Sequence, residues 1–316
     1  MADLDMAMPV RERDGYRQSA LVLGAAQLGG SYGIANTVGM PDDDATARLL
    51  RTAAELGVTH VDTARAYGES EHRIGACRVP SLRVITKVAP LGGVADAPDA
   101  VRAAVTESVA RSRAELGDDP LTLLLHRAAD ATSAGGAAWD TLRGYADDGV
   151  ADRIGVSVQS PAELHTVLGL PGLGYVQLPC NLLDRRWRDP ALTEALAARP
   201  GLVVTARSVY LQGLLAAGAA VRWPHLSDTD RDTLVGTLDL IASELGRDGR
   251  IELCLAYVLG LPWVTSVVIG AETEEQVRRN VSLAVRPPLS ADERAAVVSA
   301  LPDVPGALLD PSRWTS

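Results

Sequence analysis

Arg83-Val84-Ile85-Thr86-Lys87-Val88 is a short run of mostly apolar, β-branched residues that carries one lysine near its end. β-branched residues are enriched in strands, so this run predicts a buried strand. Runs of the same kind recur along the chain, at residues 20–25, 58–62, 83–88, 121–126, 153–158, 175–178, 202–206 and 264–269.

Longer amphipathic stretches separate these runs and predict helices. They cover residues 43–56, 98–116, 136–147, 161–168, 190–198, 228–245 and 274–283, with an extra helix at 251–259 before the last strand. Eight strand-like runs, most of them followed by a helix, predict an α/β fold of the (β/α)8 TIM barrel type. A doubly wound open sheet is less favoured, because no Gly-x-Gly-x-x-Gly turn follows an early strand.

The chain shows no linker, so we expect residues 1–316 to form one barrel domain with a core at about 20–283. Residues 1–19 and 302–316 are expected to be short surface appendages.

Composition excludes several classes of protein. The formal net charge of −10 argues against a nucleic-acid partner and against binding to an anionic membrane. Three widely spaced cysteines are typical of reduced thiols and not of a metal site. Residues 1–5 lack the pattern of a signal peptide, and no apolar run reaches membrane-spanning length. We therefore expect a cytoplasmic protein without a metal, and its oligomeric state stays open.

Lys87 is the only lysine among 30 basic residues. Lysine carries a compact point charge and arginine a planar fork, so a site that needs an ammonium cannot accept a guanidinium. The single lysine therefore marks either such a site or a chance survival.

Ionisable and polar side chains lie at the ends of several predicted strands. In a TIM barrel these ends form the active site. The residues are Asp62, Lys87, His126, Ser157 and Arg207, with Tyr67 five positions after Asp62.

Several separated motifs resemble those of the aldo-keto reductases. Val61-Asp62-Thr63-Ala64-Arg65-Ala66-Tyr67-Gly68, continued by Glu69-Ser70-Glu71 and Ile74-Gly75, resembles the second-strand signature of that family. Ile85-Thr86-Lys87 is similar to its third strand and Leu124-Leu125-His126 to its fourth. The resemblance extends roughly from residue 20 to residue 283. It implies that Asp62, Tyr67, Lys87 and His126 are the catalytic set.

The chemistry of carbonyl reduction is consistent with that set. A carbonyl that accepts a hydride develops an alkoxide and needs a proton donor at its oxygen. A phenol can serve if a nearby ammonium stabilises its phenolate, and a carboxylate can hold that ammonium. Tyr67 would then be the general acid, Lys87 its electrostatic partner and Asp62 the anchor of Lys87, while His126 would orient the carbonyl oxygen.

The resemblance also implies a nicotinamide cofactor. Ile154-Gly155-Val156-Ser157, Arg207-Ser208 with Leu211-Gln212-Gly213-Leu214-Leu215, and Ile269-Gly270 are similar to the cofactor segments of the family. The expected cofactor residues are Ser157, Gln177, Arg207, Ser208, Leu211, Gly213, Gly270, Gln276 and Asn280.

Three residues depart from the family pattern in this cofactor region. Val158 replaces an asparagine that usually holds the carboxamide, so that contact must come from Ser157 and Gln177. Arg207 stands where a ring commonly stacks on the nicotinamide, and it could stack there or face an anion. Arg279 replaces a glutamate before Asn280.

The sequence contains features that favour NADP(H) and features that favour NAD(H). Most relatives bind NADP(H), whose extra phosphate would meet the stretch of Glu272, Glu274 and Glu275 in this chain, unless Glu274 and Glu275, at the start of the last helix, point to solvent. The first-turn amides of the last helix and Arg278 or Arg279 would favour that phosphate. We expect NADP(H), with NAD(H) possible.

The substrate is a small carbonyl compound that the sequence does not identify; a sugar, a nucleotide-linked keto-sugar or a biosynthetic intermediate all fit. Tyr32, Trp187, Tyr210 and Trp223 are candidate substrate residues, although a single aromatic residue is equally typical of packing.

The sequence thus predicts an NAD(P)H-dependent oxidoreductase that reduces an aldehyde or ketone. Two alternatives stay open: a cofactor-binding regulatory barrel with little turnover, and a cofactor-independent lyase or isomerase that uses Lys87 as a nucleophile.

Overall fold

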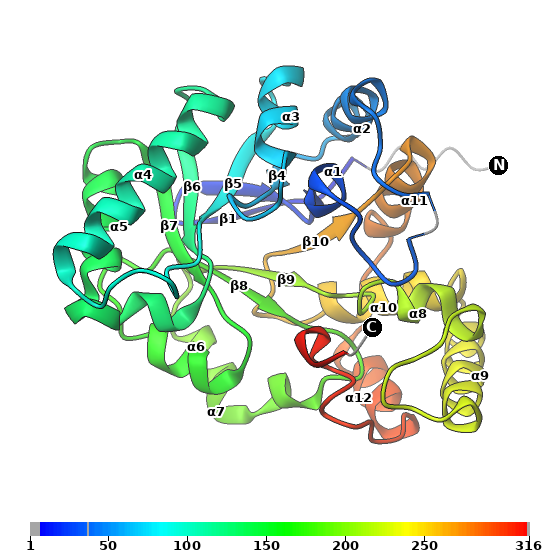
Figure 1. Ribbon diagram of the computed structural model, residues 1–316. Coiled ribbons are helices and arrows are strands. Elements are labelled where there is room, and N and C mark those ends of the chain that lie inside the picture. Colours follow the sequence, from blue (N-terminus) through cyan, green and yellow to red (C-terminus); the bar gives the residue numbers. More distant parts are fainter. Residues whose placement is uncertain (1–6, 37, 315–316) are drawn as a thin grey trace.

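The computed structural model describes residues 7–36 and 38–314, and within them eight parallel strands form a closed barrel (Figure 1). The strands follow one another in chain order around the barrel, and the last pairs with the first. They are β3 (Leu21–Gly24), β4 (His60–Asp62), β5 (Arg83–Val88), β6 (Leu121–Leu125), β7 (Ala151–Ser157), β8 (Tyr175–Pro179), β9 (Val203–Arg207) and β10 (Ser266–Gly270). The predicted TIM barrel is confirmed, because a doubly wound sheet would have two open edges.

Helices connect the strands and cover the outside of the barrel (Figure 1). They are α1 (Ala26–Gly29), α2 (Asp43–Glu55), α3 (Ser70–Cys77), α4 (Pro98–Leu116), α5 (Ala137–Asp147), α6 (Pro161–Val167), α7 (Pro190–Ala197), α8 (Leu214–Ala217), α9 (Asp228–Glu244), α10 (Gly249–Leu259), α11 (Glu274–Ala284) and α12 (Ala291–Ala300). The extra helix before the last strand is confirmed as α10. None of the described helices is both long and apolar enough to cross a membrane.

The sequence patterns explain how individual helices begin. Asp42 caps α2 by accepting from the backbone N–H of Ala45, and Leu49, Leu50 and Ala53 form its buried face. The sequence analysis did not predict α12, although a capping box of Ser290 and Glu293 marks its start.

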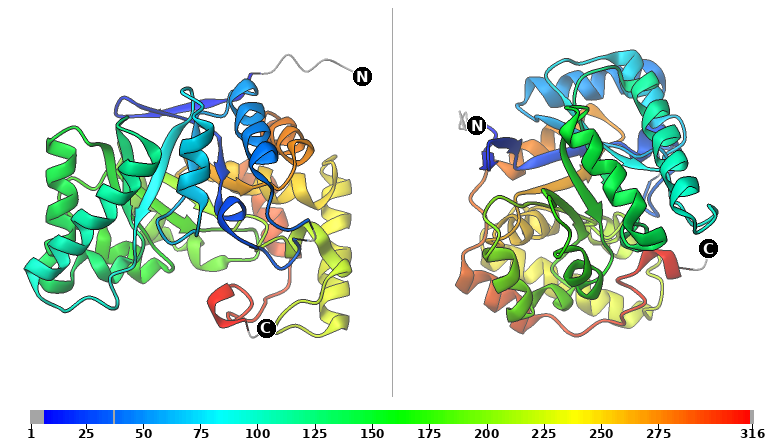
Figure 2. Two further views of the ribbon diagram at one scale, coloured as in Figure 1. Left: turned by 45° about the horizontal axis from the view of Figure 1, so that its top comes forward. Right: turned by 90° about the vertical axis from the view of Figure 1, so that its left-hand side faces the viewer.

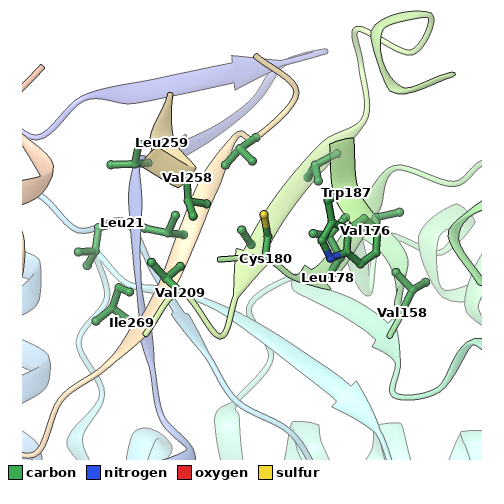
Figure 3. Close-up of a cluster of buried hydrophobic side chains, with 14 of the residues drawn as sticks. Leu21, Val158, Val176, Leu178, Cys180, Trp187, Val209, Val258, Leu259 and Ile269 are labelled. Carbon is green, nitrogen blue, oxygen red and sulfur yellow. The ribbon is translucent and has the colours of Figure 1, made fainter. Parts of the chain in front are cut away.

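Two apolar layers hold the barrel. The larger layer fills the space between the strands and the surrounding helices, and Figure 3 shows part of it, where Val176, Leu178 and Trp187 meet. The smaller layer lies inside the barrel and includes Val22, Ile85, Leu124, Tyr175 and Val203.

The expectation that residues 1–19 form a surface appendage is wrong for its second half. β1 (Val10–Arg13) and β2 (Tyr16–Ser19) form a hairpin that lies across one end of the barrel (dark blue in Figure 2, left). Tyr16 is buried in the inner core, and its hydroxyl lies 2.7 Å from Oγ1 of Thr122. The hairpin therefore closes the barrel at the amino ends of the strands. The prediction about a signal peptide concerns residues 1–5, which lie outside the described residues.

The other expected appendage, residues 302–316, is also partly built into the fold. Leu308 and Leu309 are buried in the larger core, and the indole N–H of Trp314 donates to the carbonyl of Leu308 at 3.2 Å. Arg185 joins this segment to the loop after β8 through an ion pair with Asp303.

Candidate active site

The charged centre of the site is the pair of Lys87 and Asp62. Asp62 ends β4, and Lys87 lies near the end of the neighbouring β5. The Nζ atom of Lys87 donates to both carboxylate oxygens of Asp62 at 2.9 Å and to the carbonyl of Thr63 at 2.8 Å. Both side chains are buried, with exposed fractions of 1% and 4% for the two residues. A buried charge needs such a partner, so each residue depends on the other.

Gln177 of β8 extends this pair. Its Nε2 atom donates to Oδ1 of Asp62 at 2.7 Å. Its Oε1 atom is buried and has no hydrogen-bond partner among the described residues. Ser157, the residue opposite Gln177 on β7, is buried beside it. A buried amide oxygen without a partner is rare, and it indicates a place for a donor from a bound molecule.

Tyr67 lies between Lys87 and His126 at the mouth of the barrel. The Nζ atom of Lys87 is 5.1 Å from the centroid of the Tyr67 ring. The His126 ring meets the Tyr67 ring edge to face, with centroids 5.8 Å apart. Tyr67 is partly exposed and lines the cavity described below. The structure thus brings together all four residues of the expected catalytic set.

His126 is a neutral imidazole at neutral pH. Burial, together with the positive charges of Lys87, Arg207 and Arg127, lowers the pKa of His126 to about 4. Its Nδ1 atom is buried without a partner among the described residues. A neutral imidazole keeps one N–H donor and one acceptor nitrogen.

The backbone around Tyr67 is held by close packing against α1. Oγ of Ser70 donates to the carbonyl of Ala25 at 2.8 Å. A Cβ atom on Gly29 would lie 1.6 Å from the carbonyl oxygen of Tyr67, and one on Gly68 would lie 2.2 Å from that of Gly29. The two loops therefore approach each other to a distance that only glycine permits.

Glu71 is a residue of this region that the predicted site lacks. It is buried, and its carboxylate accepts from Oγ1 of Thr86 at 2.5 Å, from Oγ of Ser112 at 2.8 Å and from Arg65. It thereby joins the loop that carries Tyr67 to the strand that carries Lys87. A charged residue between Ser70 and His72 at the start of a helix does not reveal such burial in the sequence.

A cavity of about 440 Å³ extends from Tyr67 along the ends of β9 and β10 to α11. Six of the nine expected cofactor residues line it: Arg207, Ser208, Gly213, Gly270, Gln276 and Asn280. Tyr32 and Tyr210 line it as well. Gln27 and Asn36 also line it, and the sequence analysis did not name them. Gln212, which lies in an expected cofactor segment, and Glu272, which was expected near the extra phosphate, line it as well.

Five expected contact residues do not line this cavity. Gln177 is buried against Asp62, Ser157 is buried opposite Gln177, and Leu211 is buried in the core. Trp187 and Trp223 are also core residues, and their indole N–H groups donate to Asp184 and to the carbonyl of Gly218. Figure 3 shows Trp187 against Val176 and Leu178. The two tryptophans therefore pack the core, and we do not assign them to the substrate.

The loop after β9 has an unusual backbone. Ser208, Leu211 and Gln212 have positive φ values of 59°, 47° and 52°, and Gly213 follows with 92°. Left-handed conformations are unfavourable for residues with a Cβ atom, and they concentrate at functional sites. The loop from α1 to α2 lies against this segment, since a Cβ atom on Gly213 would lie 2.7 Å from that of Ala35 (Figure 1).

Arg207 is one of two arginines that line the cavity, and the other is Arg279. Its guanidinium donates to the carbonyl of Val158 at 3.2 Å and contacts Oγ of Ser208 at 3.5 Å. Among the described residues no carboxylate lies within ion-pair distance of it. Burial lowers the pKa of Arg207.

The far end of the cavity, next to α11, carries charges of both signs. Glu272 and Arg279 both line it. Glu274 instead binds Arg48 of α2 at 3.0 Å and Oγ1 of Thr52 at 3.2 Å. Glu275 is exposed and does not line the cavity. Of the three carboxylates in this stretch, only Glu272 therefore faces the cavity.

Comparison with known proteins identifies the family. The sequence profile of the aldo/keto reductase family matches residues 20–302. No curated protein sequence matches the chain significantly. Among solved structures, an aldo-keto reductase from Bacillus halodurans in its holo form is 21% identical, with a TM-score of 0.76 over 96% of this chain and 100% of that one. A glycerol dehydrogenase from Gluconobacter oxydans is also 21% identical, with a TM-score of 0.71 over 95% of each chain. These two structures share the fold of this chain.

Proposed function

The chain belongs to the aldo/keto reductase family, an oxidoreductase family that reduces carbonyl compounds, and on that premise we propose that it reduces an aldehyde or ketone with NADP(H), using Tyr67 as the general acid. The observation that carries the proposal is the buried pair of Lys87 and Asp62 beside the ring of Tyr67.

The residues of the cavity fit a nicotinamide nucleotide. The unpartnered Oε1 atom of Gln177 is a suitable acceptor for a carboxamide N–H, with Ser157 beside it. Gly270 lines the cavity at the end of β10, where the side chain of Gln27 packs against it, 2.1 Å from where a Cβ atom would be. Gln276 and Asn280 of α11 would contact the opposite end of the nucleotide. When bound, the nucleotide supplies the hydride.

The protein residues would supply the proton and the charge stabilisation. Tyr67 would donate its hydroxyl proton to the carbonyl oxygen as negative charge develops there. Lys87 would stabilise the phenolate that remains, since Asp62 and the carbonyl of Thr63 hold the ammonium in place. His126, which is neutral, would donate its N–H to the same carbonyl oxygen and orient the substrate.

The preference for NADP(H) rests on the charges next to α11. Arg279 lines the cavity there, and its only ion pair among the described residues is a long one of 3.9 Å with Asp248. It is therefore available for a phosphate. Glu272 opposes this preference, and NAD(H) is the second candidate.

The rival reading of Lys87 as an amine nucleophile has little support in the geometry. A nucleophilic amine must be neutral and accessible. Lys87 instead makes three hydrogen bonds and is 1% exposed. Borohydride trapping of a carbonyl compound on Lys87 would favour the lyase and contradict the reductase.

Equilibrium titration with NADPH and NADH tests the proposal. We expect both to bind and NADPH to bind more tightly, and Arg279→Gln should remove that difference. Tighter binding of NADH, reversed by Glu272→Arg, would contradict the assignment to NADP(H). Binding of neither nucleotide would contradict the function as a whole. Nucleotide binding without consumption of NADPH across a panel of carbonyl compounds would instead favour the regulatory barrel.

A further inference from the structure

Arg207 reaches across the end of the barrel wall. Strand residues alternate in direction, and Thr205 points into the barrel, where its hydroxyl lies 2.6 Å from that of Tyr175. Arg207, two residues later, therefore also points inward, one layer closer to the carboxyl end. Its guanidinium donates to the carbonyl of Val158, the residue after β7. Since β8 lies between β7 and β9, the side chain crosses the end of β8.

The side chain below this crossing is Gln177. In the register of the sheet, Gln177 on β8 is opposite Ser157 on β7 and Thr205 on β9. Pro179, two residues after Gln177, is the residue opposite Arg207. The buried Oε1 atom of Gln177, which has no partner among the described residues, thus belongs to the strand that the Arg207 side chain crosses, on the amino side of that crossing.

Arg207 makes no ion pair with any of the described residues, although Asp62 and Glu163 lie near enough to favour its charge. Lys87, the neighbouring cation, has Asp62 at 2.9 Å. The acceptors within hydrogen-bond distance of Arg207 are a neutral carbonyl and a neutral hydroxyl, and among the described residues no carboxylate reaches it. A positive charge therefore faces the part of the cavity that Tyr67 and Tyr32 also border.

Two constraints place a nicotinamide ring next to this charge, if the proposed function holds. The carbonyl oxygen must reach the hydroxyl of Tyr67, and the hydride donor must lie roughly 3–3.5 Å from the carbonyl carbon. The carboxamide of the same ring would bind Gln177 and Ser157. Since Arg207 and Tyr67 line the same cavity, a ring that meets both conditions would lie close to the guanidinium of Arg207.

We infer that Arg207 is a specificity-determining residue for the oxidation state of the nucleotide, and that the site binds NADPH in preference to NADP⁺. This inference rests on the proposed function. The reduced ring is neutral, and a planar guanidinium can stack on it. The oxidised ring carries a positive charge, which a fixed cation repels. Release of the oxidised nucleotide and entry of the reduced one are both favoured, so the site suits the direction of reduction.

Binding of the two oxidation states to the wild-type protein tests this directly. NADPH and NADP⁺ carry the same phosphates, so their affinity ratio isolates the charge of the ring. We expect at least about tenfold tighter binding of NADPH by calorimetric titration, which corresponds to about 1.4 kcal/mol. Arg207→Gln should bring the ratio close to one, mainly by tightening NADP⁺, whereas Arg207→Lys keeps the charge and should keep most of the ratio.

Two results would overturn the inference. A wild-type ratio near one, with both forms bound, would overturn the inference and leave the proposed function intact. Equal weakening of both forms by Arg207→Gln would assign Arg207 to a phosphate and overturn it as well. Arg279→Gln, a change at the far end of the cavity, should weaken both forms and leave their ratio unchanged. Failure of the wild-type protein to bind either form would refute the proposed function itself.

Discussion

Lys87 is the residue whose surroundings restrict substitution most. Its ammonium is buried and binds three acceptors, an arrangement that a larger planar group would have to displace. We predict that Lys87→Arg loses nearly as much turnover as Lys87→Met, because the guanidinium cannot occupy the same position. Steady-state rates of the two variants against the wild-type protein measure this.

We predict that Lys87→Met and Lys87→Arg differ in their free energy of unfolding. Lys87→Met leaves Asp62 buried without its cation, which commonly costs about 3–5 kcal/mol, and Gln177 would remain its only side-chain donor. Lys87→Arg keeps the charge and should lose less in urea unfolding. Near-normal turnover of the arginine variant would show that the single lysine of the chain has no special role.

Tyr67→Phe removes the proposed proton donor and leaves the ring. We predict that nucleotide binding stays unchanged and that turnover falls by roughly two to four orders of magnitude, the usual contribution of general acid catalysis. Tyr145→Phe makes the same chemical change on α5, away from the cavity, and serves as the control. Comparable turnover in the two variants would remove Tyr67 from the mechanism.

The location of a site residue was predictable from the sequence where that residue ends a strand. Asp62, Lys87 and His126 each end an apolar run, and parallel strands bring such ends together. Trp187 and Trp223 could not be assigned, because one aromatic residue in a loop has no periodicity that tells packing from ligand contact. Glu71 was missed because its burial depends on partners far away in the sequence, which no local pattern shows.

The contact between α1 and the loop that carries Tyr67 should position the Tyr67 backbone. Gly29 and Gly30 are neighbours, but a Cβ atom on Gly30 would meet nothing within 4 Å. We predict that Gly29→Ala displaces the Tyr67 backbone and lowers turnover by roughly tenfold or more, while Gly30→Ala has little effect, because small misplacements of a catalytic group are costly. Equal rates for the two variants would mean that this contact does not position Tyr67.

Elements with a strong pattern were predictable, and short ones were not. All eight barrel strands occur within two residues of the predicted bounds, because most of them are short buried runs of apolar residues. The hairpin of β1 and β2 was missed: its strands have four residues each, and polar Arg17 and Gln18 lie between Tyr16 and Ser19. Its role as the closure of the barrel follows from the burial of Tyr16, which no local pattern shows.

The stability of the whole molecule should depend on two histidines: His60, which is buried, and His126, which is half-buried. Burial and the charge of Arg83 lower the pKa of His60 to about 3, and that of His126 is about 4. Both values lie below the ordinary histidine pKa of about 6.5. Between the folded-state values and pH 6.5, the unfolded chain therefore binds more protons than the folded protein, since that pKa of about 6.5 applies to it. Stability from the two neutral side chains is therefore present above pH 6.5 and is lost as the pH falls.

We predict that the free energy of unfolding drops by roughly 2–4 kcal/mol between pH 7 and pH 5, as measured by urea denaturation. His60→Gln should reduce that slope by about half, since one of the two groups no longer titrates. A free energy of unfolding that stays constant over this range would contradict the account of the two histidines.

The closed barrel was predictable as a whole because a repeated strand and helix pattern has few solutions. The assignment of residues 1–316 to one domain remains a prediction, as does the choice of NADP(H). That choice depends on which carboxylates face the cavity, and the sequence could not show that Glu274 turns away to Arg48.

The central claim is that this protein transfers a hydride to a carbonyl carbon. Reaction with NADPH that carries deuterium at the transferable position of the nicotinamide tests it most directly, with a panel of aldehydes and ketones and mass analysis of the products. The account predicts an alcohol with one deuterium on the carbinol carbon, formed at least about a hundredfold more slowly by Tyr67→Phe. Absence of labelled alcohol from the whole panel, or labelling at the same rate by the variant, would contradict it.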